Sequence, residues 1–313
     1  MTHRMTKRLR RVYRDTQGKC SACGRKLAAK ETQHVGYDAA GVAVCVGNCC
    51  KKLVAETAAR YAHMPPTYES PSDDAVLWRY TDFVKFTSLL ATKSLYFTRG
   101  DRFEDPFEGA MGAAANRPKW DKHYREFFRD CVLHPPGGHV PPSEAHAEKE
   151  ARRLLKEFKS HNRRAEHFIT CWYESSHQSE AMWRLYSRDQ SQGVAISTSA
   201  RRLRLATGDD PEIIIGRVKY IDYDRQFAPL DESFFYKRLA FRHEQEVRAV
   251  LHKREDPPEC GLVVPAKLDR LIESVHVSPF APDWFLKTVQ ATMSAFGVRK
   301  KVKQSRLSKQ PFH

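Results

Sequence analysis

The alternation of apolar and polar side chains predicts a strand, a helix and a second strand at the start of the main body of the chain. Residues 76–81 (V-L-W-R-Y-T) and 93–98 (K-S-L-Y-F-T) show the twofold period of strands. Between them, apolar side chains recur at helical spacing, and Asp82 precedes them in the position of a helix N-cap. The polar stretch R-G-D-R-F-E-D-P-F-E-G follows and is expected to form a loop.

Helices and strands alternate irregularly over the rest of that body. A glutamate-rich amphipathic helix is expected from residue 143 to about residue 164, and Gly297 stands where a left-handed cap usually ends a helix. The other expected elements are strands at 167–173, 193–199, 212–220 and 274–279 and helices at 179–187, 232–241 and 282–296. This irregular order favours an α+β fold over a doubly wound parallel sheet.

The stretch R-L-A-F-R-H-E-Q-E-V-R-A-V-L-H, residues 238–252, is expected to run from the end of a helix straight into a strand. Glu244 and Glu246 are two positions apart, so in an extended backbone both carboxylates project from one face. Val247 and Ala249 alternate with them and are expected to face a core. Two adjacent carboxylates repel each other and raise at least one pKa, which marks them as candidate catalytic residues.

Length and composition indicate a globular chain of about two domains. The chain has 313 residues, of which 41% are hydrophobic. It contains no run near the roughly 20 apolar residues that a membrane helix needs. The N-terminal sequence M-T-H-R-M-T-K-R-L-R-R has no apolar segment of the kind found in secretory signals. We therefore expect no membrane partner and a cytoplasmic location.

The net charge of +15 is concentrated at the two ends of the chain. Residues 1–60 contain 13 Lys/Arg and 4 Asp/Glu, and residues 299–309 contain 6 basic residues and no acidic one. Basic ends typically bind phosphate backbones by releasing counterions. We therefore expect contact with DNA or RNA through the termini; the alternative is that the charge only keeps the protein soluble.

Cysteines cluster in the N-terminal segment with the spacing of metal ligands. C-S-A-C-G and C-V-G-N-C-C supply Cys20, Cys23 and Cys45 as candidates, with Cys49 or Cys50 as the fourth. The order of knuckle, hairpin, knuckle and helix resembles a treble-clef zinc module, in which four thiolates hold a structural Zn²⁺. His34 is an alternative ligand, but a single histidine in a polar hairpin is more often a surface residue.

This segment also resembles zinc-stabilised HNH-type nucleases. The resemblance covers about 35 residues, which is roughly the length of the smallest domains that fold around a metal ion. The acidic–histidine pair of those nucleases is absent, since Gln33 precedes His34. A structural or nucleic-acid-contacting module is therefore favoured over nuclease chemistry. The Pro- and Ser-containing stretch M-P-P-T-Y-E-S-P-S-D-D is typical of a linker. The expected organisation is a basic arm with the zinc module at 1–63, a linker at 64–75, the main domain at 76–298 and a basic tail at 299–313.

Four groups of segments in the main domain together resemble a bacterial family of uncharacterised proteins that is itself similar to ADP-ribosyltransferases. They are W-R-Y-T, S-L-Y-F-T with D-P-F-E, A-M-W-R-L-Y with G-V-A-I-S-T-S, and H-E-Q-E-V-R, within residues 76–297. The resemblance implies an α+β fold with a split mixed or antiparallel sheet, a helical insertion, and NAD as the substrate. It also implies a nucleic-acid or protein acceptor, a cognate antitoxin, and a role as a toxin or in defence against phage.

The resemblance also implies roles for individual residues. Arg79 would hold a phosphate or ribose of NAD, Glu246 would stabilise the oxocarbenium-like transition state, and Glu244 would orient or deprotonate the acceptor. The residues that would stack on the nicotinamide ring or order the site are Tyr80, Tyr96, Thr98, Ser197 and Thr198.

Structural interpretations of the same residues stay open. In this alternative, Arg79 does not bind NAD but forms an ordinary ion pair with a carboxylate such as Asp105 or Glu108. The two glutamates, flanked by Arg242 and Arg248, fit a charge ladder on an edge strand, and D-P-F-E fits a capped turn. The leading hypothesis is an NAD-dependent ADP-ribosyltransferase. The alternatives are a non-catalytic zinc-containing nucleic-acid-binding protein and, less favoured, an HNH-like nuclease.

Overall fold

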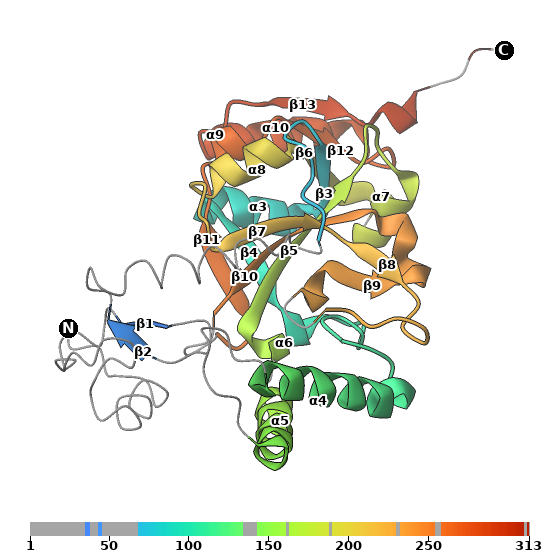
Figure 1. Cartoon of the computed structure of the whole chain (residues 1–313). Coiled ribbons are helices and arrows are strands. Elements are labelled where there is room, and N and C mark those ends of the chain that lie inside the picture. The colour runs from blue at the N-terminus through green and yellow to red at the C-terminus, as the bar shows by residue number, and fades with distance from the viewer. Residues whose placement is uncertain are drawn as a thin grey trace. The chain divides into compact units, whose positions relative to one another are not determined.

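The computed structural model describes residues 35–37, 43–45, 68–133, 143–160, 163–187, 190–229, 232–253, 258–309 and 312. The chain divides into two compact units, one made of residues 1–66 and 118–161 and the other of residues 67–117 and 162–313 (Figure 1). The first unit thus includes the helical insertion that separates the two parts of the second. Among the described helices, none is long and apolar enough to cross a lipid bilayer.

The first unit contains a short hairpin and two long helices. β1 (Val35–Tyr37) pairs antiparallel with β2 (Ala43–Cys45), which places a hairpin between the two cysteine clusters as expected. The helices are α4 (Arg117–Leu133) and α5 (Glu144–Ser160). The predicted zinc ligands Cys20, Cys23, Cys49 and Cys50 lie outside the described residues. Within the described part of the chain, no group of three His, Cys, Asp or Glu side chains is placed to hold a metal ion.

The second unit is built on a mixed sheet of nine strands, so the predicted α+β class is confirmed. The strands are β3 (Val76–Asp82), β4 (Ser94–Arg99), β5 (His167–Glu174), β6 (Gly193–Ser199), β7 (Ile213–Arg217), β10 (Glu246–His252), β11 (Gly261–Pro265), β12 (Ser274–Val277) and β13 (Lys301–Gln304). The main path runs β7-β10-β5-β3-β6-β12-β13, and all neighbours are antiparallel except β12 and β13.

The sheet forks at β5. One side of β5 pairs with β3 through residues 173–174 and with β4 through residues 168–169, while its other side pairs along its whole length with β10. Residues 170–172 therefore have no strand partner on the forked side. β4 continues the branch to β11. The fork confirms the expectation of a split sheet.

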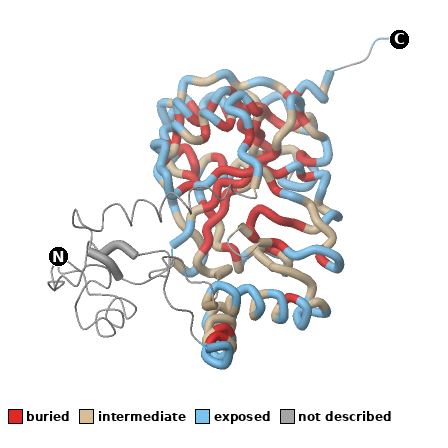
Figure 2. Tube along the Cα trace, in the orientation of Figure 1, coloured by how far each residue is buried: buried red, intermediate tan, exposed pale blue. Residues whose placement is uncertain are grey.

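The two faces of this sheet pack against different elements. One face carries the largest apolar cluster and packs against α3 (Phe83–Thr92), α8 (Ala200–Ala206) and α10 (Asp283–Ala295). Val247 and Ala249 are fully buried on this core face, as predicted. The opposite face, here called the site face, packs against α7 (Glu180–Tyr186) and two smaller aromatic clusters. Burial is densest along the central strands (Figure 2).

Four expectations about elements and their boundaries differ from the structure. The helix expected at 232–241 is absent: a 3₁₀ turn (Ser233–Phe235), β9 (Tyr236–Arg238) and a second 3₁₀ helix (Leu239–Glu244) occupy that stretch. β9 pairs with β8 (Lys219–Ile221), because the expected strand at 212–220 is two strands, β7 and β8. The end of the expected linker packs within the second unit, since the ring of its residue Tyr68 stacks on Phe235 with centroids 4.7 Å apart. The expected basic tail supplies the edge strand β13.

Candidate active site

The two candidate glutamates converge, but not by lying on one strand. Glu244 is the last residue of the 3₁₀ helix, and Glu246 is the first residue of β10. Gln245 between them adopts a left-handed conformation with φ 39° and ψ 51°. A non-glycine residue in this conformation costs on the order of 1–3 kcal/mol and is typical of functional sites. The backbone turn, rather than an extended strand, brings the carboxylates together.

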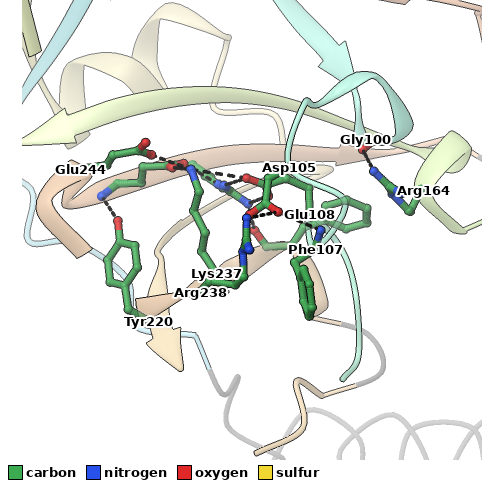
Figure 3. A network of polar contacts seen from close by, with 12 residues as sticks. Gly100, Asp105, Phe107, Glu108, Arg164, Tyr220, Lys237, Arg238 and Glu244 are labelled. Carbon is green, nitrogen blue, oxygen red and sulfur yellow. Dashed lines mark hydrogen bonds and ion pairs between the residues drawn. The ribbon is translucent and has the colours of Figure 1, made fainter. Parts of the chain in front are cut away.

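Lys237 joins the two carboxylates. Its Nζ lies 2.5 Å from Oε2 of Glu244 and 2.6 Å from Oε1 of Glu246, and it contacts the Phe241 ring at 4.5 Å (Figure 3). Lys237 is the central residue of β9, so the strand that replaces the expected helix is what delivers this cation. All three polar side chains are less than 9% exposed.

Arg248 extends the network from the carboxylate pair to the D-P-F-E loop. Its Nε donates to Glu246 at 2.7 Å, and its two terminal nitrogens donate to the two oxygens of Glu108 at 2.7 and 2.9 Å. Arg248 is completely buried. The loop is also a capped turn, since Asp105 accepts a hydrogen bond from the backbone of Phe107 at 3.1 Å. The turn thus positions Glu108 for the site.

The charges in this network do not balance. It contains three buried carboxylates and two cations, so one negative charge is in excess when every group is ionised. Burial raises the pKa of Glu244 to about 7, and its hydrogen bond with Glu246 and the charge of that carboxylate act in the same direction. Burial also acts to raise the pKa of Glu246, but Arg248, the hydrogen bond with Glu244 and Lys237 hold it well below its ordinary value. The network therefore takes up one proton near neutral pH, on Glu244.

Two tyrosines and a thiol border the carboxylate pair. Tyr186 lies on α7 with its side chain partly exposed; burial of the hydroxyl, the charges of the two glutamates and a hydrogen bond with Glu244 raise its pKa. The hydroxyl of Tyr220 accepts a hydrogen bond from the backbone N–H of Glu246 at 2.8 Å. Burial raises the pKa of Cys171, with Glu246 adding to the effect, so this thiol stays neutral.

An open pocket of about 570 Å³ adjoins the pair at the end of the central strands. Gln245 and Glu246 form part of its wall, and Arg217 and Glu174 form another part. Arg217 and Glu174 are joined by a two-pronged ion pair at 2.7 and 2.8 Å, so they are already neutralised. The Glu246 side chain is only 5% exposed, and both of its carboxylate oxygens are held by Lys237 and Arg248.

Arg79 is not in the same polar network as the glutamates. Strand register places it opposite Ile196 of β6, on the core face, whereas Glu246 lies opposite Tyr173 on the site face. The guanidinium lies at the fork, where it donates to the hydroxyl of Thr170 and stacks over Trp172 at 5.6 Å. It makes no ion pair within the described residues, so the expected pairing with Asp105 or Glu108 does not occur. Burial lowers its pKa.

The other predicted NAD-binding side chains are dispersed. Tyr80 is buried against Trp183 at 4.9 Å and accepts a hydrogen bond from the backbone of Ser179. Ser197 and Thr198 point to opposite faces, and Thr198 donates to the carbonyl of Leu271. The remaining two, Tyr96 and Thr98, lie on β4 in the other branch of the fork. The structure does not gather these residues around the glutamates.

Several residues of the site were not assigned a role from the sequence. Lys237 lies in a stretch for which the sequence predicts a helix. Thr170, which accepts a hydrogen bond from Arg79, lies in a mostly apolar strand. Glu108 and Arg248 belong to the motifs D-P-F-E and H-E-Q-E-V-R. The sequence therefore contained both partners of this ion pair, an acidic side chain in one motif and a basic side chain in the other.

Comparisons with known proteins give only distant structural similarity. No family model and no curated protein matches the sequence. Among solved structures, DarT of Thermus sp. 2.9 in complex with NAD⁺ overlaps at a TM-score of 0.36 with 11% identity, covering 77% of this chain and all of DarT. Its complexes with carba-NAD⁺ and with ADP-ribosylated single-stranded DNA overlap at a TM-score of 0.35 with 12% identity, covering 77% and 78% of this chain and again all of DarT. Similarity at this level assigns neither a family nor an activity to this chain.

Proposed function

We propose that Glu244 and Glu246 form the active site of an NAD-dependent ADP-ribosyltransferase. The observation that carries the proposal is the convergence of two buried carboxylates on Lys237, with Arg248 on Glu246 alone, which lowers the pKa of Glu246 and leaves that of Glu244 raised. Such a separation of pKa values is how enzymes assign two roles to two adjacent carboxylates. NAD is the first substrate to test, because it is the ligand named in the complex of the neighbouring structure.

The chemistry follows from the two protonation states. As the bond between ribose C1′ and the nicotinamide nitrogen lengthens, positive charge develops on the ribose, and the anionic Glu246 stabilises it. The bond breaks with its electron pair leaving on nicotinamide. The acceptor nucleophile then forms a bond to C1′, and its proton passes to ionised Glu244. Lys237 and Arg248 keep Glu246 charged throughout this sequence.

We further propose that Arg79 binds a phosphate group of NAD; because Arg79 lies on the core face and Glu246 on the site face, one NAD molecule has to reach both faces through the fork. A half-buried guanidinium without a carboxylate partner in the described chain is suited to an anion that a ligand brings. The hydrogen bond to Thr170 and the stacking on Trp172 hold it in place at the fork, and β5 alone separates β3 from β10.

For the acceptor, nucleic acid is the class that the charge distribution favours. Lys301 and Lys303 of β13 are exposed and alternate on one face of an edge strand, and neither makes an ion pair within the described residues. A protein side chain remains the alternative acceptor. Label transfer to single-stranded DNA, RNA or a protein separates these classes directly.

The test is incubation of the full chain with labelled NAD and each acceptor class, with release of nicotinamide as a second readout. Glu246→Gln should lower both rates by about 10²–10³, the usual effect of removing one group that stabilises transition-state charge. Glu273→Gln is the matched control, since this glutamate is exposed and lies outside the network. Equal rates for wild type and Glu246→Gln, or the absence of both products with every acceptor, would refute the proposal.

A second candidate function has one observation in its favour. Both oxygens of Glu246 are occupied by cations of the protein, as in a network that only stabilises the fold. On this reading the chain is a non-catalytic nucleic-acid-binding protein with a zinc module. It predicts salt-sensitive binding that is unchanged by Glu246→Gln and no release of nicotinamide.

A further inference from the structure

A basic groove lies between the two helices of the first unit. The start of α4 contacts the end of α5, since Trp120 lies 5.9 Å from the Phe158 ring and Lys159 pairs with Asp121 at 2.6 Å. Arg129 at the other end of α4 pairs with Glu144 at the start of α5, so the helices run in opposite directions. Their apolar sides pack together and leave an open groove of about 750 Å³ along the outside.

The lining of this groove is almost entirely cationic. It contains five basic side chains, one carboxylate, one leucine and one proline: Pro118, Asp121, Lys122, Arg125, Arg152, Leu155, Lys156 and Lys159. On α5 the basic residues recur at intervals of four and three, which places them in one row about 10 Å long. The glutamates of the same helix that bind arginines, such as Glu150 and Glu157, lie outside the lining.

Some of the basic side chains in this groove pair with carboxylates of the protein and others do not. Arg152 pairs with Glu148 at 2.8 Å, Arg125 lies 3.7 Å from the same carboxylate, and Lys159 pairs with Asp121. Lys122 and Lys156, which are both exposed, form no ion pair within the described residues. Exposed helices ordinarily intersperse acids with such lysines. Here cations of both helices line a common groove, and two of them have no acidic partner among the described residues.

We infer that the α4–α5 groove binds the phosphate backbone of a nucleic acid. Phosphates repeat along a strand and match a row of basic side chains, whereas an anionic membrane needs a flat or convex surface with exposed apolar residues. The groove is concave, and Leu155 is its only leucine among the lining residues. An acidic peptide would find few apolar pockets to anchor its side chains. The inference deepens the proposed function, because it names a surface that would hold an acceptor of that class.

The experiment measures binding without NAD, so it is independent of catalysis. The full chain is titrated with a fluorescein-labelled 20-nucleotide single-stranded DNA in increasing NaCl, and anisotropy gives the affinity. The groove variant is Lys122→Gln with Lys156→Gln. The control variant is Lys119→Gln with Lys287→Gln, which removes the same charge from two exposed lysines outside the groove.

Loss of two phosphate contacts should lower the slope of log affinity against log salt by about 1.4, a loss of about 25-fold at 0.1 M salt. The control should retain the wild-type slope. Equal losses in both variants would show that only net charge matters and would overturn the inference, as would no loss in the groove variant. Preferential loss of binding to phosphatidylserine vesicles or to poly-glutamate, with DNA binding intact, would overturn it in favour of another partner. If label transfer fails but the groove variant alone loses DNA binding, the inference stands and the proposed function does not.

Discussion

Replacing Glu244 with glutamine should make the protein considerably more stable at pH 8 and only slightly more stable at pH 5. The reason is the excess carboxylate in the buried network: at high pH the ionised Glu244 is held next to Glu246, and only Lys237 compensates it directly. Glutamine carries no charge at any pH. Its amide retains one donor and one acceptor, so it can replace the protonated acid between Glu246 and Lys237.

The magnitude follows from the pKa of Glu244, which burial and the neighbouring carboxylate raise from 4.5 to about 7. Each pKa unit corresponds to about 1.4 kcal/mol, so the full effect is about 3 kcal/mol. The side chain is only 7% exposed, so little of this is lost to solvent screening. Because the folded-state pKa is raised, the stabilisation of the protonated form is fully present below pH 4.5 and is lost as the pH rises through 7.

Two buried histidines act in the opposite direction. Burial lowers the pKa of His167 and of His276 from 6.5 to about 4. Their stabilising contribution is present above pH 6.5 and is lost as the pH falls through 4. The free energy of unfolding of the wild type therefore depends on pH through groups that act in opposite directions. The histidine contributions are the same in wild type and Glu244→Gln, so they cancel in the difference between the two proteins, which reports on Glu244 alone.

The assay is urea unfolding at pH 5, 6, 7 and 8, followed by tryptophan fluorescence. Four of the five tryptophans lie in the second unit, so the signal reports mainly on the unit that contains the site. The free energy of unfolding of Glu244→Gln should exceed that of wild type by about 3 kcal/mol at pH 8 and by only about 1 kcal/mol at pH 5. Glu273→Gln should show no such pH-dependent difference. A difference that is flat from pH 5 to 8, or a variant less stable than wild type at pH 8, would refute the charge argument.

Three further predictions concern the network, the reaction and the metal. Glu108→Gln removes one partner of the buried Arg248 and should lower the free energy of unfolding by about 3–5 kcal/mol in the same urea assay; a loss below 1 kcal/mol would contradict the pairing. The rate of nicotinamide release should rise with pH through about 7 as Glu244 ionises, and a profile that falls over this range would exclude it as the base. If the N-terminal cysteines hold zinc, atomic absorption should find about one zinc ion per chain, lost in Cys20→Ser but kept in Cys260→Ser, an exposed free thiol; a zinc-free wild type would end that proposal.

Much of the second unit follows from local pattern. The twofold period over 76–81 and 93–98 predicted β3 and β4 to within one residue, and Asp82 caps α3 as expected by accepting from the backbone of Lys85. Gly297, with φ 74°, ends the last long helix in the expected way. These features depend on neighbours within a few residues, which is why the sequence suffices for them.

The 232–244 stretch shows where local pattern fails. Its apolar spacing fits a helix, but the backbone instead pairs β9 with β8, and the gain of that pairing depends on residues elsewhere in the chain. This strand places the Lys237 amine within hydrogen-bond distance of both glutamates, so the failed helix prediction also missed the cation of the site. The left-handed Gln245 follows this stretch directly, and no propensity of glutamine predicts that conformation.

The sequence by itself indicated two glutamates, two positions apart, whose carboxylates repel each other, and a strand that follows them. Only the tertiary structure decided which groups surround them. Glu108 reaches the site across a separation of 140 residues from Arg248, while Arg79 lies on the core face and does not. The physical reason is that a twofold period fixes which side chains of one strand share a face, whereas the pairing register between strands fixes which of them meet.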